Sequence, residues 1–464
     1  MSSVPAPESP LAHLARWATG LTYEQIPVVA RHRAHLALRD TIGAIVRGAD
    51  TAAGRVAVAV AAANPGPAAV PGAPNVRSVP AFAAFAGAAH ASALDIDDGH
   101  YRGGAIHPSS VIVPSLLVAA QALDGVDRRR FTVAQVVGYE IGLRAAHLLW
   151  PKHELDDYHC TGTAATLGAA AAVAVLRDGD ADAVARAIAI AWAHAPMATF
   201  QLPMVKESIG WSAASAVFAA DLAAAGFMAM PSGVRSSLDA TFPPTPFHRA
   251  GAMDDPFVAS LGAVFETANT YFKPYPACRY THTALRSLAE MIDGGLLADD
   301  VDRIEVFTPQ ASMNLSEQRP ATLEHAQYSF PFVLATLLCC GSADADEISD
   351  DGLTDETRLA VAARVTVHHD PTLDPTYPAH YATRLVVHTR DGMQHEMLRL
   401  VAPGDQDDPM SDDDLAAKFV RLTASRLRAD AKAIGAALVA ADDSHDDDHD
   451  AARFADLLHQ AVMQ

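Results

Sequence analysis

The first half of this 464-residue chain is rich in alanine, and its apolar residues recur at helical spacing. From about residue 9 to residue 226, apolar side chains lie three or four positions apart, with almost no β-branched alternation. The pattern predicts helices near 79–93, 110–123, 132–149, 162–176, 182–194 and 210–225, separated by breaks that contain Pro or Gly. Because alanine side chains are small, we expect these helices to pack closely in a multi-layer bundle.

The pattern changes near Phe265. Residues 303–308 and 359–368 alternate like strands, and 383–389 and 394–400 alternate on either side of an Asp-Gly pair, which is typical of a hairpin. Helices are expected near 281–293 and 329–338, and the helical pattern returns with Ser411 as an N-cap. We therefore predict a mainly α protein with an α+β insert. Residues 1–267 and 403–464 form one large helical domain, and 268–402 form a smaller α+β lid domain.

The composition excludes several classes of partner. The net charge of −21 argues against nucleic acid and against an anionic membrane surface, since both require a basic face. Charged residues make up only 19% of the chain and hydrophobic residues 50%, which favours a large folded core over disorder. The most apolar window, 167–176, is too short to span a membrane.

The N-terminus has no basic region followed by an apolar run, so no secretory signal is expected. The four cysteines lack C-x-x-C spacing, and the adjacent pair Cys339 and Cys340 is interpreted as two small core residues. Both features predict a cytoplasmic protein. The acidic run 442–450 is interpreted as a solvated loop.

An acidic segment, 94–100, holds Asp95, Asp97, Asp98 and His100, and His107 follows it. Three interpretations stay open: a divalent metal site, a structural junction whose aspartates cap backbone amides, and a catalytic acid/base centre. In the third, carboxylate contacts tune an imidazole toward neutral pH. We expect Ser109 or Ser110 to cap the next helix.

His159 precedes a second helix, whose first turn holds Thr161, Gly162 and Thr163. Free amides at a helix start suit an anionic group, so two such N-termini that converge would bind carboxylates. Taken alone, each is more often an ordinary capped helix.

Two of the five lysines lie in low-charge stretches marked by Pro or Gly, namely Lys206 and Lys273. Lysine is a compact cation whose pKa moves on burial, so these two are candidates for catalysis, although a surface lysine in a loop is the alternative. Lys152, Lys418 and Lys432 lie in charged or helical surroundings. Lys273 is followed by Arg279 and His282 at the expected domain boundary, where clefts favour small ligands.

The chain contains no G-x-S-x-G, P-loop, Rossmann-type G-x-G-x-x-G or H-E-x-x-H motif. Chemistry that needs no cofactor is therefore favoured.

Taken together, these segments resemble the MmgE/PrpD family, which includes 2-methylcitrate dehydratase, cis-aconitate decarboxylase and iminodisuccinate epimerase. The matching residues extend over almost the whole chain: Leu94 to Asp98, His107-Pro108, His159, Gly162-Thr163, Leu167-Gly168, Lys206, Lys273 to Pro276, His282, Tyr328 to Pro331, and the 403–411 turn.

The resemblance implies a helical domain plus a lid domain with the active site between them, usually in a homodimer, and no metal or organic cofactor. It implies a catalytic group of Asp95, His107, His159, Lys206 and Lys273. We expect Asp98, Arg279 and His282 to contact the substrate.

Three departures weaken cis-aconitate decarboxylase in particular. Gly99 stands where relatives that act on cis-aconitate or methylcitrate tend to have Thr, and Met313 stands where an active-site Tyr is expected. The gap from the acidic segment to His107 also looks longer than in the decarboxylases.

The main hypothesis is a dehydratase-type lyase that acts on a small di- or tricarboxylate such as 2-methylcitrate, through proton abstraction next to a carboxylate. An epimerase of an iminodisuccinate-like acid, with acid/base groups on opposite faces of one carbon, is the second hypothesis. A non-catalytic or metal-binding relative that uses the Asp/His cluster is the third.

Overall fold

The computed structural model describes residues 9–100, 106–150, 160–196, 206–227, 245–440 and 447–463. The N-terminal half contains the helices α1 Pro10–Gly20, α2 Val28–Gly48, α3 Ala52–Ala62, α4 Pro80–Ser92, α5 Ser109–Ala120, α6 Arg128–Leu149, α8 Cys160–Leu176, α9 Ala181–His194, α10 Lys206–Ala224 and the short α11 Pro256–Ala259. The C-terminal half contains α12 His282–Asp293, α13 Leu323–Gln327, α14 Phe330–Cys340, α15 Glu356–Ala362, α16 Asp412–Leu427, α17 Ala431–Val439 and α18 Asp447–Met463. The expected class, mainly α with an α+β part, is confirmed.

Local sequence sets the helix starts. Asp127 caps α6 by accepting from the Arg130 amide at 2.7 Å, and Asp180 caps α9 in the same way. Ser411 caps α16 as predicted, in a capping box with Asp414.

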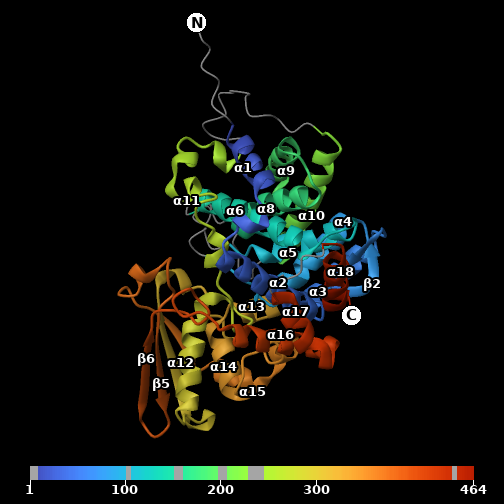
Figure 1. The fold of residues 1–464 in the computed structure, drawn as a ribbon. Coiled ribbons are helices and arrows are strands. Elements are labelled where there is room, and N and C mark those ends of the chain that lie inside the picture. The colour runs from blue at the N-terminus through green and yellow to red at the C-terminus, as the bar shows by residue number, and fades with distance from the viewer. Residues whose placement is uncertain are drawn as a thin grey trace.

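Small residues let the helices of the upper part in Figure 1 pack closely, as the alanine content predicted. At the α6–α8 contact, a Cβ on Gly168 would lie 2.2 Å from the Gly138 carbonyl oxygen. Only glycine permits this close approach of α6 and α8.

The largest sheet has the strand order β4-β3-β5-β6, formed by β4 Val365–His369, β3 Val301–Thr308, β5 Thr383–Thr389 and β6 Gln394–Arg399. β3 pairs parallel with β4 and antiparallel with β5, and β5 and β6 form the predicted hairpin across Gly392. The helices α12 and α14 cover its apolar face, so this block has its own core in the lower part of Figure 1.

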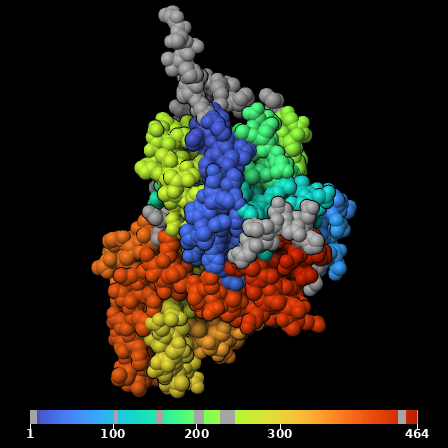
Figure 2. Space-filling view, viewed as in Figure 1, coloured from blue at the N-terminus to red at the C-terminus, as the bar shows by residue number. Residues whose placement is uncertain are grey.

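The main core draws residues from both ends of the chain, because α16, α17 and α18 pack against α2. Figure 2 shows the blue N-terminal helices lying directly against the red C-terminal ones. The second core, from residues 277–387, also includes Ala44, Leu94, Ile96 and Leu422 of the helical part. The acidic segment therefore lies where the two cores meet.

Several expectations about local structure are wrong. Residues 359–362 belong to α15, and only from Val365 does a strand begin. β1 Ala68–Val70 and β2 Ala73–Ser78 form a small hairpin where only a break was expected. Cys339 and Cys340 are exposed at the end of α14 and do not belong to the core. In the acidic run, 447–450 begin α18, while 442–446 lie outside the described residues. No helix in the described part of the chain combines the length and the apolar character that crossing a membrane requires.

Candidate active site

The acidic segment follows the end of α4 and turns sharply into the protein. Asp95 adopts φ of +50°, a left-handed conformation that Asp tolerates better than most residues. Asp95, Asp97 and Asp98 are all buried. Three carboxyl groups with so little solvent require cations or hydrogen-bond donors close by.

Lys273 supplies one of these cations. It lies in the extended stretch that precedes α12, and its ammonium donates to the Asp95 carbonyl at 2.9 Å and to the Asp95 carboxylate at 3.1 Å. An Asp97 oxygen lies 3.9 Å away. Burial alone lowers the pKa of Lys273, but the attraction of Asp95 and Asp97 outweighs it and leaves the pKa above the ordinary value. Lys273 is therefore protonated, and no described residue accepts a hydrogen bond from its third N–H.

His107 lies immediately before α5. Its Nδ1 is 2.6 Å from the Asp98 carbonyl oxygen, which can only accept, so Nδ1 carries the proton and Nε2 the lone pair. Burial and the charge of Lys273 lower the pKa of His107, with Asp97 and Asp95 opposing. The imidazole is thus neutral and oriented, as a general base requires.

Asp98 is held from two helices. One carboxylate oxygen accepts from the Ser109 hydroxyl at 2.6 Å and from the Ser109 amide at 3.2 Å. The other accepts from the Tyr139 hydroxyl of α6 at 2.6 Å. Burial raises the pKa of Asp98 to about 7 although these bonds favour the charged form. Both oxygens, expected to face a substrate, are thus engaged within the protein.

The expected capping of α5 by Ser109 or Ser110 is wrong. Pro108 is the N-cap residue, and the Ser109 hydroxyl serves Asp98 while the Ser110 hydroxyl donates to the His107 carbonyl.

The starts of α5 and α8 converge, since the His107 amide donates to the Thr161 hydroxyl at 3.0 Å. The start of α10 joins them, because the Ser212 hydroxyl donates to the Gly162 carbonyl at 2.8 Å. Lys206 is the first residue of α10, which brings its backbone to this side of the bundle. The side chain of Lys206 and all of His159 lie outside the described residues.

Arg279 and His282 are near Lys273, and the fold engages the guanidinium of Arg279 and one of the two ring nitrogens of His282. Arg279 forms a buried two-pronged ion pair with Asp405, and its guanidinium lies over the ring of Tyr271 at 4.9 Å. His282 Nε2 is 2.9 Å from the Ala277 carbonyl oxygen. Burial and Lys273 lower the pKa of His282 to about 3, so it is neutral.

Gly99 pairs with Tyr271 through the backbone and lies against its ring. The two residues exchange backbone hydrogen bonds at 3.1 and 2.9 Å, and a Cβ on Gly99 would lie 2.3 Å from the Tyr271 hydroxyl oxygen. The phenol thus fills the space of a side chain at position 99. Met313 is half-buried after β3, at the end of a 3-10 turn.

Sequence reasoning missed three buried groups around the acidic segment: Tyr271, Tyr328 and Lys418. The Tyr328 hydroxyl is 3.4 Å from an Asp95 carboxylate oxygen. The Lys418 ammonium donates to the Ile96 carbonyl at 2.8 Å. Lys418 was interpreted as part of an ordinary charged helix, and it lies in α16, but its side chain is fully buried. Its position one turn after Leu415, on the apolar side of α16, was the available signal.

The metal-site interpretation gains no support from the geometry. Across the described ranges, no three His, Cys, Asp or Glu side chains are grouped so that they could hold a metal ion.

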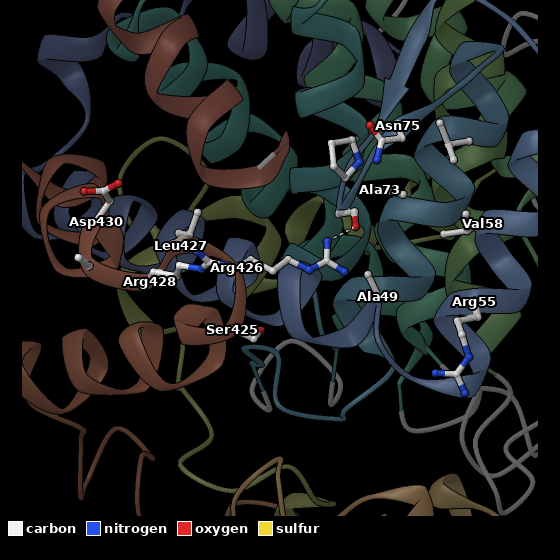
Figure 3. A pocket seen from close by; sticks show the side chains of 14 residues that line it. Ala49, Arg55, Val58, Ala73, Asn75, Ser425, Arg426, Leu427, Arg428 and Asp430 are labelled. Atoms are coloured by element: carbon white, nitrogen blue, oxygen red, sulfur yellow. Dashed lines mark hydrogen bonds between the residues drawn. The ribbon is translucent and has the colours of Figure 1, made fainter.

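Three cavities lined by described residues lie away from the acidic segment. The largest, of about 910 Å³, lies between α3, β2 and the end of α16 (Figure 3). There Arg426 reaches across to the Gly72 carbonyl, while Arg428 and Asp430 lie on the opposite side in the view. None of the candidate site residues lines this cavity or the other two.

Comparisons with known proteins identify the family of this chain. The chain is 25% identical to human cis-aconitate decarboxylase over 372 residues, which cover 77% of this chain and 75% of that enzyme. It is 25% identical to mouse cis-aconitate decarboxylase over 370 residues, 77% of this chain and 74% of that enzyme. Residues 12–238 match the MmgE/PrpD N-terminal domain, and residues 275–443 match the MmgE/PrpD C-terminal domain. Asp95 and His107 lie within the first matched range, and the ion pair of Arg279 with Asp405 lies within the second. Because the two matches together cover most of its length, the chain belongs to the MmgE/PrpD family.

Proposed function

We propose that this protein is a cofactor-independent lyase that eliminates water from a small hydroxylated di- or tricarboxylate such as 2-methylcitrate. The observation that carries the proposal is a neutral, oriented imidazole beside a buried, protonated ammonium. His107 presents Nε2 as a base, and Lys273 keeps one N–H for a substrate carboxylate. From its cysteine usage and N-terminal sequence we also propose that it is cytoplasmic, and from the family resemblance that it is a homodimer.

The proposed reaction begins at the carbon next to a carboxylate. His107 Nε2 takes the proton from that carbon, and the electron pair of the C–H bond delocalises into the carboxylate. Negative charge grows on the carboxylate oxygens, where Lys273 and Lys206 stabilise it. A preorganised donor of this kind contributes roughly 3–4 kcal/mol to such a transition state.

Elimination then forms the carbon–carbon double bond. The electron pair moves between the two carbons, the neighbouring C–O bond breaks, and the leaving hydroxyl takes a proton to depart as water. We assign this acid role to His159, which follows the family resemblance. Asp95 holds the Lys273 ammonium in place, and the Asp98 carbonyl fixes the tautomer of His107.

Decarboxylation of cis-aconitate is the second candidate, favoured by the names of the two relatives. It uses the same cations but breaks a C–C bond, releases CO₂ and needs a proton donor to the remaining carbanion. Gly99, with Tyr271 in the space beside it, departs from the Thr expected for cis-aconitate and for methylcitrate alike. The longer gap between the acidic segment and His107 is the departure that counts against a decarboxylase in particular.

The test is an NMR assay of the full-length protein with 2-methylcitrate, citrate, cis-aconitate and iminodisuccinate. We expect loss of water from 2-methylcitrate, and at least about 100-fold lower turnover in His107→Ala and Lys206→Ala. The matched controls are His395→Ala on β6 and Lys432→Ala on α17, both exposed, which we expect to behave as the wild type.

The outcomes separate the alternatives. Release of CO₂ from cis-aconitate supports the decarboxylase instead. Deuterium uptake from D₂O into iminodisuccinate, without loss of water or CO₂, supports an epimerase. Turnover that survives both His107→Ala and Lys206→Ala contradicts the site assignment.

A further inference from the structure

We propose that Lys418 and Asp40 are a positioning pair for the active site, which together with Lys273 hold the acidic segment in its reactive shape. This inference rests on the proposed function, because it assigns the pair a role in that reaction. Lys418 lies in α16 and Asp40 in α2, so the pair joins the two ends of the chain beneath the site.

The contacts of Lys418 are short and fully buried. Its ammonium is 2.7 Å from an Asp40 carboxylate oxygen and 2.8 Å from the Ile96 carbonyl oxygen. The side chains of Lys418 and Asp40 are 0% and 2% exposed. Ile96 lies between Asp95 and Asp97, whose carboxylates are 3.1 and 3.9 Å from the Lys273 ammonium. The hydrogen bond that Lys418 donates to the Ile96 carbonyl therefore also restrains these two residues.

Two ammonium groups thus donate hydrogen bonds to consecutive backbone carbonyls of one short segment. Lys273 takes the Asp95 carbonyl at 2.9 Å, and Lys418 takes the Ile96 carbonyl at 2.8 Å. The left-handed turn at Asp95 is a strained conformation that persists only where surrounding contacts determine it. The pair of lysines provides those contacts, one from the α+β side and one from the helical side.

Stability alone does not account for the pair. Replacing a buried ion pair by apolar residues is often neutral or stabilising, so its presence is weak evidence of a stabilising role. The second oxygen of Asp40 has no hydrogen-bond partner in the described structure, which adds to the cost. What the pair adds is a fixed donor for Ile96. Burial raises the pKa of Asp40 and lowers the pKa of Lys418, and the negative charge of Asp97 adds to the first shift and opposes the second.

The experiment compares Lys418→Met with the double variant Asp40→Asn/Lys418→Met. The single variant leaves Asp40 as an unpaired buried charge, so its melting temperature should fall. The double variant removes that charge, so its melting temperature should recover, whereas Ile96 still lacks its donor. We therefore expect kcat of the double variant to stay about 100-fold below wild type with KM little changed, since small misplacements of reacting groups have effects of this size.

Two further variants sharpen the comparison. Asp40→Asn/Lys418→Gln keeps an N–H donor beside Ile96 without a charge, and we expect it to regain part of kcat. Lys432→Met, an exposed lysine of the next helix, is the matched control and should equal the wild type. A double methionine variant that is stable and turns over at the wild-type rate would overturn the positioning role.

A readout without substrate separates this inference from the proposed function. Hydrogen–deuterium exchange should be faster in peptides that cover 93–100 in both double variants, and most in the methionine one, while α9 is unchanged. If the wild type converts none of the acids, the proposed function fails and the exchange result still decides the inference. Unchanged exchange in 93–100 refutes it.

Discussion

Asp98 gives the sharpest quantitative prediction, because its carboxyl group is buried and titrates near neutrality. Burial raises its pKa from 3.8 to about 7. The folded protein therefore holds this proton more tightly than the unfolded chain does, and the protein loses stability as pH rises from about 4 to about 7.

The magnitude follows from the two pKa values. They differ by about 3.2, and each unit corresponds to about 1.4 kcal/mol, so ionised Asp98 destabilises the folded state by roughly 4 kcal/mol. Part of this loss has already occurred at pH 5. Between pH 5 and pH 8 the remaining loss is about 2.5 kcal/mol.

The perturbation is Asp98→Asn, which does not titrate and keeps an oxygen that can accept from Ser109. We expect the free energy of unfolding of the variant, relative to wild type, to rise by about 2.5 kcal/mol from pH 5 to pH 8. Urea unfolding followed by circular dichroism at pH 5, 6, 7 and 8 measures this difference.

The control is Asp302→Asn, since Asp302 is exposed on β3. Its unfolding free energy should follow the wild type at each pH. If the Asp98→Asn and wild-type values also run parallel from pH 5 to pH 8, the argument from burial is wrong.

Three other changes test separate parts of the structure. Lys273→Met leaves Asp95 and Asp97 without their cation, so we expect turnover at least about 100-fold lower and a lower melting temperature. The double variant Asp95→Asn/Lys273→Met should recover the melting temperature but not the turnover, and recovery of both would contradict the role proposed for Lys273. Gly99→Thr must displace the Tyr271 ring, so we expect the free energy of unfolding in urea to fall by about 1–3 kcal/mol, and Gly99→Thr/Tyr271→Ala to relieve this clash. An unaffected single variant would show that the ring is not confined. Glu140→Gln removes the buried charge that pairs with Arg144 and weakens the acceptor of the Thr267 hydrogen bonds, so we expect the free energy of unfolding to fall by about 3–5 kcal/mol. A fall below about 1 kcal/mol would mean that the pair is dispensable.

Much of the fold could be predicted from local sequence. Helix starts were readable where a capping residue precedes an apolar periodic run, as at Ser411. The error at 359–362 arose because Leu359 and Val361 in the helix, like Val365 and Val367 in the strand, lie two positions apart, so the spacing of two runs across the helix-to-strand boundary. The signal against a strand was Asp355, which caps α15 by accepting from the Thr357 and Arg358 amides.

The candidate site was predictable only in part. Motifs drew attention to Asp95, His107 and Lys273, and the structure brings these three together. The partner of Arg279 is Asp405, which follows the α+β insert, and no local pattern links the two. Lys418 and Asp40 come from opposite ends of the chain, so neither spacing nor composition could pair them.

The pairing of Asp40 with Lys418 also has a consequence for biosynthesis. A ribosome that adds about 5–20 residues per second needs roughly 20–80 s to proceed from residue 40 to residue 418. Throughout that interval the carboxylate of Asp40 lacks the ammonium of Lys418, and the C-terminal helices α17 and α18, which also pack against α2, have not been made. The nascent α+β block is translated in full before Lys418 is added, so the proposed active site is among the last parts of the molecule to assemble.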